Sequence, residues 1–206
     1  MKQGLFITME GPDGSGKSTQ IDAIKRFFED RGESVVLTRE PGGTQISEKI
    51  RALLLDRENS EMNPMAEALL YAASRAQLVA QVIKPALDSG THVICDRFVD
   101  SSIAYQGYGR DLGDSVAVIN AYAVNGCMPD ATFLMKLNPE IGKLRIKTSE
   151  QDRMEMEKLE FHNKVFAGYE ALEKEFPDRI VGIDATRNIE EISEDILSHV
   201  ERLLAR

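Results

Sequence analysis

Residues 11–18 carry the motif that most constrains what this chain can fold into. The stretch GPDGSGKS has the required residue at every fixed position of the pattern G-x-x-x-x-G-K-[ST]. It follows residues 5–9, an apolar run typical of a buried strand, and precedes residues 19–28, whose apolar positions recur at helical spacing. A strand, a glycine-rich loop and a helix in this order predict a loop that binds phosphate with its backbone amides and the helix N-terminus.

The residues of this loop have distinct expected tasks. Its glycines allow the backbone to wrap closely around an anion. Lys17 is expected to contact the β- and γ-phosphates of a nucleotide, and the Ser18 hydroxyl is expected to bind Mg²⁺. The residues expected to contact the triphosphate, ATP, are Gly11, Asp13, Gly14, Ser15, Gly16, Lys17, Ser18 and Thr19.

Strand-like and helix-like segments alternate along the rest of the chain. Short apolar runs predict strands at residues 34–38, 92–95, 131–137 and 179–183. Helical periodicity predicts helices at residues 46–55, 66–87, 116–124, 139–146, 155–176 and 189–204. The alternation predicts an α/β fold of three layers, in which helices cover both faces of a five-stranded parallel sheet. We find no repeat or linker, so residues 1–206 are expected to form a single domain.

The composition excludes several classes of protein. With 42% hydrophobic and 29% charged residues, the chain is neither disordered nor fibrous. The formal net charge of −9 argues against a nucleic acid polymer as partner, because binding to a phosphate backbone depends on a basic surface. No run of about 18 apolar residues exists that would span a membrane. The first strand begins so early that we expect no signal peptide, and therefore a cytoplasmic protein.

Charged residues follow the second and third predicted strands. Arg39 comes directly after residues 34–38, and Asp96 and Arg97 come directly after residues 92–95. Ligands of parallel sheets bind beyond the carboxyl ends of the strands, so these side chains are expected to meet the phosphate loop. Asp96 then has the position of a magnesium-binding carboxylate, although an aspartate that ends a strand also caps turns.

The number of arginines predicts a second phosphorylated ligand. A triphosphate is adequately bound by the loop, Lys17 and Mg²⁺, and arginine suits bidentate binding of a further phosphate. Arg51, in the helix predicted at residues 46–55, either joins Arg39 and Arg97 at this ligand or is a solvated residue of the helix face.

A polar segment at residues 147–153 interrupts two predicted helices. Cations lie in and around it, and we expect a short flexible lid over residues 142–154. Such a lid would close over ATP, exclude water and place a cation at the transferring phosphoryl group. The alternative is an exposed connection between helices with mixed charges.

Four motifs in this order resemble those of bacterial thymidylate kinases, which have the P-loop NTPase fold. The first is the phosphate loop with its flanks, and the second is TREPGGT at residues 38–44. The third is LLYAASR at residues 69–75, and the fourth, DRFVDSSIAYQG at residues 96–107, is the most specific. The phosphate loop alone marks only a large superfamily, whereas the other three single out thymidylate kinases. The resemblance runs from about residue 4 to the C-terminal helix.

The resemblance implies transfer of the γ-phosphoryl group of ATP to dTMP, giving dTDP and ADP for the synthesis of dTTP, with Mg²⁺ as the cofactor. It implies that Tyr71 stacks on thymine and that Arg75 reaches the carbonyl edge of the base. By the same resemblance, Ser102 and Gln106 hydrogen-bond the base. Tyr105 crowds the 2′ position of the sugar, which would select a deoxyribonucleotide.

The sugar and phosphate of dTMP are also assigned by the resemblance. Asp13 would bind the 3′-hydroxyl, a role that suits a carboxylate in a loop that otherwise binds anions. The dTMP phosphate would contact Arg39, Arg51 and Arg97. The catalytic residues implied are Lys17, Arg39, Arg97 and a cation from the lid. The family is usually homodimeric, so we expect a homodimer, with the helices predicted at residues 66–87 and 116–124 as candidate interface elements.

The source of the catalytic cation departs from part of the family. Some members have an arginine within the phosphate loop, where this chain has Gly14. The lid must then supply the cation, but this lid is shorter and less rich in arginine than the common bacterial version. We expect Arg153 to take the role, with Arg145 and Lys147 as alternatives. No general base is expected, because a phosphate monoester with a second pKa of about 6 is mostly ionised at pH 7.

Three other functions stay open at this point. A kinase for dUMP, CMP or AMP is disfavoured only by the resemblance of the base-binding set. A regulatory GTPase would need a guanine-reading Asn-Lys-x-Asp segment, whereas Asn163 and Lys164 continue into Val165 and Phe166 within a predicted helix. A catalytically silent nucleotide-binding protein is disfavoured by the intact phosphate loop and by the Asp-Arg pair of the fourth motif.

Overall fold

The central element of the fold is one parallel sheet. The computed structural model describes residues 4–145 and 151–205. Five strands pair in the order β2-β3-β1-β4-β5, and every pairing is parallel. The strands are β1 (Phe6–Glu10), β2 (Val35–Arg39), β3 (His92–Asp96), β4 (Ala131–Lys136) and β5 (Ile180–Asp184). The predicted parallel sheet is confirmed, and each strand lies within about one residue of its predicted bounds.

Strand register brings the predicted polar residues to one edge of the sheet. Arg39 pairs with Asp96 across β2 and β3, and Met9 pairs with the same Asp96 across β1 and β3. Three strands therefore end at the same level, and the loops that follow them leave the sheet side by side. This is the edge at which parallel sheets bind ligands.

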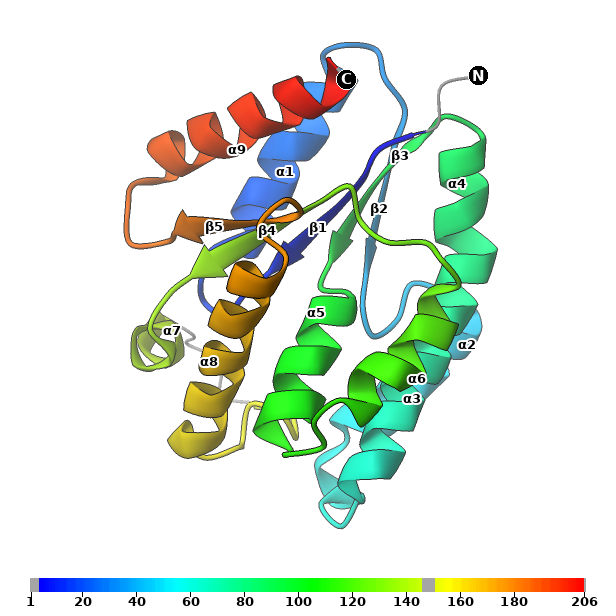
Figure 1. Cartoon of the computed structure of the whole chain (residues 1–206), viewed down its shortest axis with the longest axis vertical. Coiled ribbons are helices and arrows are strands. Elements are labelled where there is room, and N and C mark those ends of the chain that lie inside the picture. The colour runs from blue at the N-terminus through cyan, green and yellow to red at the C-terminus, as the bar shows by residue number, and fades with distance from the viewer. Residues whose placement is uncertain (1–3, 146–150, 206) are drawn as a thin grey trace.

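Helices cover both faces of the sheet, which confirms the three-layer α/β/α prediction (Figure 1). One face is covered by α1 (Lys17–Glu29) and α9 (Ile189–Leu204). The other helices are α2 (Gln45–Leu55), α3 (Pro64–Leu78), α4 (Lys84–Asp88), α5 (Val99–Ser102), α6 (Ser115–Val124), α7 (Pro139–Arg145) and α8 (Leu159–Glu175). Between them lie the 3₁₀-helix η1 (Arg57–Asn59) and the π-helical segments η2 (Val79–Ile83) and η3 (Ile103–Gly109).

Each face of the sheet has its own hydrophobic core. On one face Ile24 and Phe28 of α1 pack with Ile196 and Val200 of α9, and all four side chains are fully buried. On the other face the continuous run α3–η2–α4 packs with Phe98 and with β3. Burial of a large apolar side chain contributes roughly 1.5–3 kcal/mol to the free energy of unfolding. Both helical layers therefore stabilise the sheet, because each shields one face of the central strands from water. Among the described helices, none is long and apolar enough to cross a membrane.

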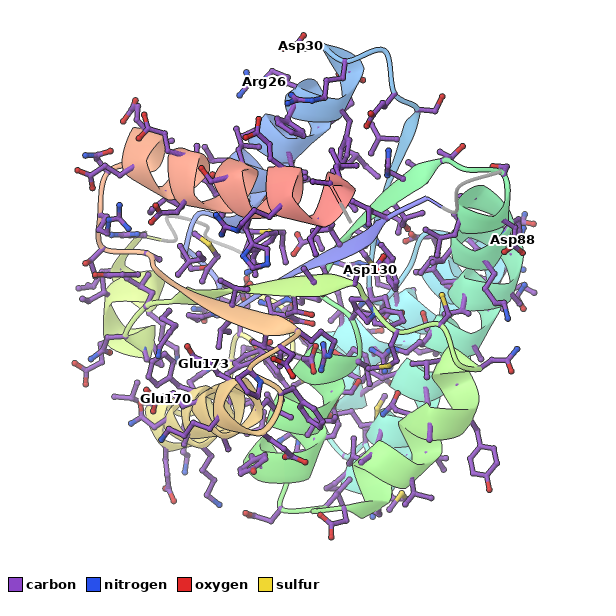
Figure 2. All side chains as sticks on the ribbon, turned by 45° about the horizontal axis from the view of Figure 1, so that its top comes forward. Arg26, Asp30, Asp88, Asp130, Glu170 and Glu173 are labelled. Carbon is purple, nitrogen blue, oxygen red and sulfur yellow. The ribbon has the colours of Figure 1, made fainter. Side chains whose placement is uncertain are left out.

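Polar contacts fix the ends of the strands. Asp130, just before β4, accepts a hydrogen bond through Oδ2 from the backbone N–H of Phe6 at 2.7 Å (Figure 2). At the other end of β4, Lys136 Nζ donates to Glu173 Oε2 of α8 at 2.7 Å (Figure 2). The first contact locks β4 to the start of β1, and the second holds α8 against the sheet.

The segment after β3 differs from the sequence prediction. Residues 99–109 form α5 and η3, although no helix was predicted there. The segment packs tightly against α8: a Cβ on Gly109 would lie 2.6 Å from the ring of Phe161. Short polar and glycine residues weaken the helical periodicity of this stretch, and its helical state depends on that packing. By contrast, Pro64 at the first position of α3 and the Asn63 cap, which accepts from Met65 N at 2.9 Å, follow the expected helix start.

Candidate active site

The phosphate loop connects β1 to α1 in a conformation that requires glycine. Gly11 has φ 125° and Gly16 has φ 90°, both in the left-handed region. A Cβ on Gly11 would lie 2.4 Å from the carbonyl oxygen of Met135, so the loop runs close against β4. Gly16 caps α1 without any side-chain hydrogen bond, which leaves the first-turn amides of the helix available to an anion.

Lys17 lies over the loop from the first turn of α1. Its side chain is 7% exposed, and Nζ donates to the carbonyl oxygens of Gly11 at 3.1 Å and Pro12 at 3.0 Å. Burial, together with the positive charge of Arg97, lowers the pKa of Lys17 to about 8. The charged ammonium group is therefore largely shielded from water, and its attraction for phosphate oxygens is stronger there than in bulk solvent.

Arg97 joins the phosphate loop to the segment after β3. It has φ 66°, an uncommon value for a residue with a side chain, and this turns the guanidinium back toward the loop. Nη2 donates to Asp13 Oδ1 at 2.6 Å, and Nη1 donates to Tyr169 Oη at 3.2 Å. Burial alone raises the pKa of Asp13, but the charges of Arg97 and Lys17 outweigh it and hold this pKa well below its usual range.

Asp96 and Ser18 form a donor set that fits Mg²⁺. Both line the same cavity at the phosphate loop, and they are oxygen donors, which this cation prefers. Asp96 Oδ1 is buried and has no hydrogen-bond partner among the described residues, a costly state that a bound cation would relieve. The described residues contain no group of three or more His, Cys, Asp or Glu side chains suited to a metal. Two protein donors suit Mg²⁺, because it usually takes its remaining ligands from phosphates and water.

A cavity of about 440 Å³ opens over the phosphate loop. Its lining includes five of the residues predicted to contact ATP: Asp13, Gly14, Gly16, Lys17 and Ser18. The other three, Gly11, Ser15 and Thr19, do not line it. Four arginines also line it, so that with Lys17 its cations outnumber its three carboxylates: Arg39, Arg51, Arg97 and Arg145 against Asp13, Glu40 and Asp96.

A second cavity, of about 200 Å³, adjoins the first. The two share four lining residues: Asp13, Glu40, Arg51 and Arg97. The second is also lined by all five residues predicted to surround a base and sugar: Tyr71, Arg75, Ser102, Tyr105 and Gln106. The structure therefore brings every predicted substrate-binding residue to these two adjoining cavities, Arg39 on the loop side and the others on the base side.

Arg75 is held rigidly at the wall of the second cavity. It is 1% exposed and donates to Ser102 Oγ at 3.0 Å and to the carbonyl oxygen of Phe98 at 2.9 Å. It also donates to Asn120 and forms an ion pair with Glu40. Burial raises the pKa of Glu40 to about 7 even beside the arginine. The Nη groups of Arg75 are therefore fully engaged within the protein, and its buried Nε is the donor without a partner among the described residues.

Arg39 and Arg51 converge on the loop after β2. Nη1 of each donates to the carbonyl oxygen of Pro41, at 3.1 Å from Arg39 and 3.0 Å from Arg51. Arg39 Nη2 also donates to Glu48 Oε2 at 3.1 Å. Two cations at one carbonyl repel each other, and an anion placed between them would remove that repulsion.

The lid cations take different places. Arg145, at the end of α7, lines the phosphate-loop cavity, and its Nη1 donates to the carbonyl oxygen of Gly14 at 3.4 Å. Arg153 lines neither cavity. It is 8% exposed, donates through Nε to Leu54 O at 2.8 Å and pairs with Glu67 Oε2 at 2.7 Å. Lys147 lies outside the described residues.

Two residues near Arg97 were not selected from the sequence, Ser101 and Tyr169, whereas Glu10 was expected either to reach Mg²⁺ through water or merely to end its strand. Glu10 ends β1 and accepts from the backbone N–H of Phe98 at 2.7 Å, from Ser101 Oγ at 2.5 Å and from Tyr169 Oη at 3.0 Å. Burial and the nearby Asp100 raise the pKa of Glu10 to about 7. Glu10 follows the rule that the ends of parallel strands meet at one edge. Nothing in the sequence pattern brings Tyr169, from the middle of α8, to this place.

Comparison with known proteins identifies the family. The thymidylate kinase family matches residues 9–196. The chain belongs to this family. It is 51% identical to a thymidylate kinase of Exiguobacterium sp. (strain ATCC BAA-1283 / AT1b), over 97% of this chain and 96% of the relative. It is 44% identical to a thymidylate kinase of Halalkalibacterium halodurans over the full length of both. A crystal structure of thymidylate kinase from Ehrlichia chaffeensis has a TM-score of 0.78 and 31% identity, covering 97% of this chain and 99% of that one.

Proposed function

We propose that this chain transfers the γ-phosphoryl group of ATP to dTMP, giving dTDP and ADP in the synthesis of dTTP. Its membership of the thymidylate kinase family supports the reaction. The observation that carries the proposal is the pair of adjoining cavities that share Arg97 and Asp13. One cavity is built for phosphates, and the other has the shape and lining for a base with a sugar.

The chemistry at the junction is electrostatic. Two nucleotides that meet with their phosphates in line repel each other, and the acceptor oxygen of dTMP is already mostly ionised at pH 7. No proton needs to be removed, and no histidine lines either cavity. Lys17, Arg39 and Arg97 would offset the repulsion and stabilise charge on the equatorial oxygens.

Mg²⁺ is the cofactor in this proposal. Ser18 and Asp96 would hold it beside the phosphate loop, where it supplies charge to the β- and γ-phosphates of ATP. Oδ1 of Asp96 has no hydrogen-bond partner among the described residues, and Ser18 carries the hydroxyl group that the loop motif assigns to Mg²⁺.

Among the described residues, two arginines are candidates for the lid cation, while the third candidate, Lys147, lies outside them. Arg153 is the residue that the sequence favoured, but its contacts with Leu54 and Glu67 turn it away from the phosphate loop. Arg145 lies at the loop and lines its cavity. In the conformation of this structure, Arg145 is therefore better placed for the transferring group, and Arg153 would need to leave its ion pair.

A panel of acceptors tests the proposal. Purified enzyme with ATP and Mg²⁺ is assayed with dTMP, dUMP, the ribonucleotide TMP, dCMP, CMP and AMP, and ADP release is followed. We expect the highest kcat/KM for dTMP and a strong preference over TMP, because Tyr105 lines the sugar side of the cavity. A higher kcat/KM for AMP or CMP, or no transfer to dTMP, would refute the proposal.

We further propose a cytoplasmic homodimer in which residues 1–206 form one kinase domain. Leu69 of α3 is 50% exposed, and Val118 and Tyr122 of α6 are 59% and 83% exposed. The two helices pack against each other at one edge of the molecule (Figure 1). Apolar side chains gathered on one surface mark an interface. Light scattering after size exclusion tests this, and Tyr122→Glu is expected to give monomers.

A further inference from the structure

Glu67 lies beneath the base cavity, in a place that no motif assigned. It belongs to α3, one turn before Tyr71, and its side chain is completely buried. Gln106 Nε2 donates to its Oε1 at 2.9 Å. Arg110 donates to Oε1 at 3.2 Å and to Oε2 at 3.0 Å, and Arg153 pairs with Oε2 at 2.7 Å. One carboxylate thus accepts hydrogen bonds from a base-site amide and from Arg110, which follows η3, and forms an ion pair with the lid residue Arg153.

These contacts keep Glu67 ionised. Burial alone raises the pKa of Glu67, but hydrogen bonds from Arg110 and Gln106 and the charges of Arg110 and Arg153 leave this pKa below its ordinary value. An ionised carboxylate has no hydrogen to donate and only accepts. The amide of Gln106 must therefore face Glu67 with its NH₂ group, because the flipped amide would bring its oxygen against a negative charge.

The direction of the carbonyl oxygen of the Gln106 amide is then determined. Gln106 lines the base cavity, and its Oε1 accepts no hydrogen bond from the described residues. The side chain thus presents a carbonyl oxygen to a bound base. A carbonyl oxygen accepts a hydrogen bond and is repelled by a lone pair.

We propose that Glu67 is the positioning residue that selects the type of pyrimidine. By holding the Gln106 amide in one orientation, it turns Oε1 toward the ring nitrogen N3 of the base. A 2,4-dioxopyrimidine such as thymine carries N3–H and donates to this oxygen. A 4-aminopyrimidine such as cytosine has a lone pair on N3 and is rejected. The inference rests on the proposed function of this cavity as the dTMP site.

Glu67→Gln is the informative variant. Arg110 Nη2 donates to Oε2 and Arg153 pairs with it, so the new amide is expected to keep its oxygen there and to put its NH₂ at the position of Oε1, where the longer hydrogen bond from Arg110 Nε is lost. That NH₂ group then faces Gln106, whose amide flips to accept from it. The flipped Gln106 presents NH₂ to the cavity, which suits the N3 lone pair of a 4-aminopyrimidine.

The readout is a competition between dTMP and 5-methyl-dCMP. The two nucleotides differ only at N3 and C4 of the ring, so the contributions of the methyl group, the sugar and the phosphate to kcat/KM cancel in the ratio. The ratio of their kcat/KM values is measured with both in one reaction, and it is independent of how much of the preparation is folded. We expect dTMP to be strongly preferred by the wild type and the ratio to fall at least about tenfold in Glu67→Gln, the scale of one buried hydrogen bond replaced by an unmatched pair.

Glu157→Gln is the matched control. Glu157 pairs with Arg110 in the same cluster and makes no hydrogen bond to Gln106 among the described residues. Its neutralisation removes one carboxylate charge from the same cluster and leaves the contact of Glu67 with the Gln106 amide in place, so the ratio is expected to stay at the wild-type value. An unchanged ratio in Glu67→Gln overturns the proposal. An equal fall in Glu157→Gln also overturns it, because the effect would then come from general loosening of the cluster.

A second variant keeps the test decisive if Glu67→Gln does not fold. Gln106→Met retains Glu67 and removes the amide, so it costs dTMP a hydrogen bond and relieves 5-methyl-dCMP of a repulsion. The ratio is expected to fall, and a ratio unchanged from the wild type overturns the proposal. Failure of the proposed function is distinguishable from failure of this inference, because a wild-type enzyme that does not phosphorylate dTMP fails before any variant is compared.

Discussion

Asp13 Oδ1 accepts a hydrogen bond from Arg97 Nη2 at 2.6 Å and thereby ties the phosphate loop to the segment after β3. This contact accounts for a carboxylate in a loop that binds anions, because the charge of Asp13 is balanced by Arg97 and, at 3.7 Å, by Lys17. A phosphate that enters the junction competes with Asp13 for Arg97. If Arg97 turned to the phosphate, the carboxylate of Asp13, which lines both cavities, would be free to accept a hydrogen bond from a sugar hydroxyl.

The expected contact of Asp13 with the 3′-hydroxyl predicts a substrate-dependent loss of kcat/KM in Asp13→Asn. A hydrogen bond to a charged partner contributes about 1.5–3 kcal/mol, which is a factor of about 10–150 in kcat/KM. We expect a loss of this size for dTMP and a much smaller loss for 3′-deoxy-dTMP, which lacks the hydroxyl. Asp22→Asn, at an exposed position of α1, is the control and is expected to behave as the wild type. Equal losses with both substrates would contradict the assignment.

The buried ammonium of Lys17 predicts a pH-dependent capture of ATP. With a pKa of about 8 in the free enzyme, Lys17 is charged at pH 7 and loses its charge as the pH rises through 8. We expect kcat/KM for ATP to fall about tenfold per pH unit above that value. The kcat at saturating ATP should decline only at higher pH, because bound phosphates favour the charged form.

Lys17→Ala provides the complementary test. It is expected to abolish transfer while circular dichroism and the melting temperature stay close to the wild type, since Nζ contacts only carbonyl oxygens of its own loop and the exposed side of Asp13. Near-normal turnover in this variant would refute the assignment of the loop. A profile of kcat/KM for ATP that is flat to pH 9.5 would refute the assignment of the titrating group.

The sheet and the edge that carries the site were predictable because they depend on local patterns. Apolar runs marked the strands, and parallel strands bring their ends together whatever helices lie between them. Arg39, Asp96 and Arg97 were found in this way. Glu10 follows the same rule, and the sequence leaves open whether it reaches Mg²⁺ through water or merely ends its strand.

Contacts between distant segments were not predictable from one sequence. The hydrogen bond of Tyr169 to Glu10 joins residues 159 positions apart. Glu67 is buried against Arg110 and Arg153 because the lid residue Arg153 packs against α3. The spacing of charged residues along the chain does not predict this contact. The helical state of residues 99–109 likewise depends on packing against α8. Such features require the tertiary structure, because local propensity is only a weak guide to them.

The positions of the two lid arginines predict opposite effects for their removal. Arg145→Ala is expected to lower kcat by about 10³-fold or more with a small change in KM for dTMP, as for loss of an arginine finger. Arg153→Ala is expected mainly to lower the free energy of unfolding, by about 1–3 kcal/mol, because its hydrogen bond to Leu54 and its ion pair with Glu67 are lost. Steady-state kinetics and urea unfolding of both variants are the measurements.

Lys143→Ala is the control for this pair. Its Nζ donates to the carbonyl oxygen of Glu157 at 3.0 Å and does not line the phosphate-loop cavity, so kcat is expected to be unchanged. If Arg153→Ala lowers kcat far more than it weakens dTMP binding, Arg153 leaves its ion pair during turnover and takes the catalytic role. If neither arginine affects kcat, the role falls to Lys147.

The pair formed by Arg179 and Asp100 predicts the largest effect on stability outside the site. Arg179 donates to Asp100 through two parallel hydrogen bonds of 2.6 and 2.8 Å, and Asp100 is 1% exposed. Arg179→Ala leaves that carboxylate buried and unpaired, so we expect the free energy of unfolding to fall by about 3–5 kcal/mol in urea titrations. Arg187→Ala, which breaks an exposed arginine–carboxylate pair with Asp195, is expected to leave the unfolding midpoint unchanged.

We expect a lower pH to restore part of the stability that Arg179→Ala loses. Burial and Asp100 raise the pKa of Glu10 to about 7, against an ordinary value of 4.5. The native state therefore binds more protons than the unfolded state between these values, and stability rises as the pH falls through 7 toward 4.5. Without Arg179 the repulsion between Glu10 and Asp100 is less compensated, so Arg179→Ala should gain more stability than the wild type between pH 8 and about pH 5. A loss that is the same at every pH would mean that Arg179 acts through packing alone.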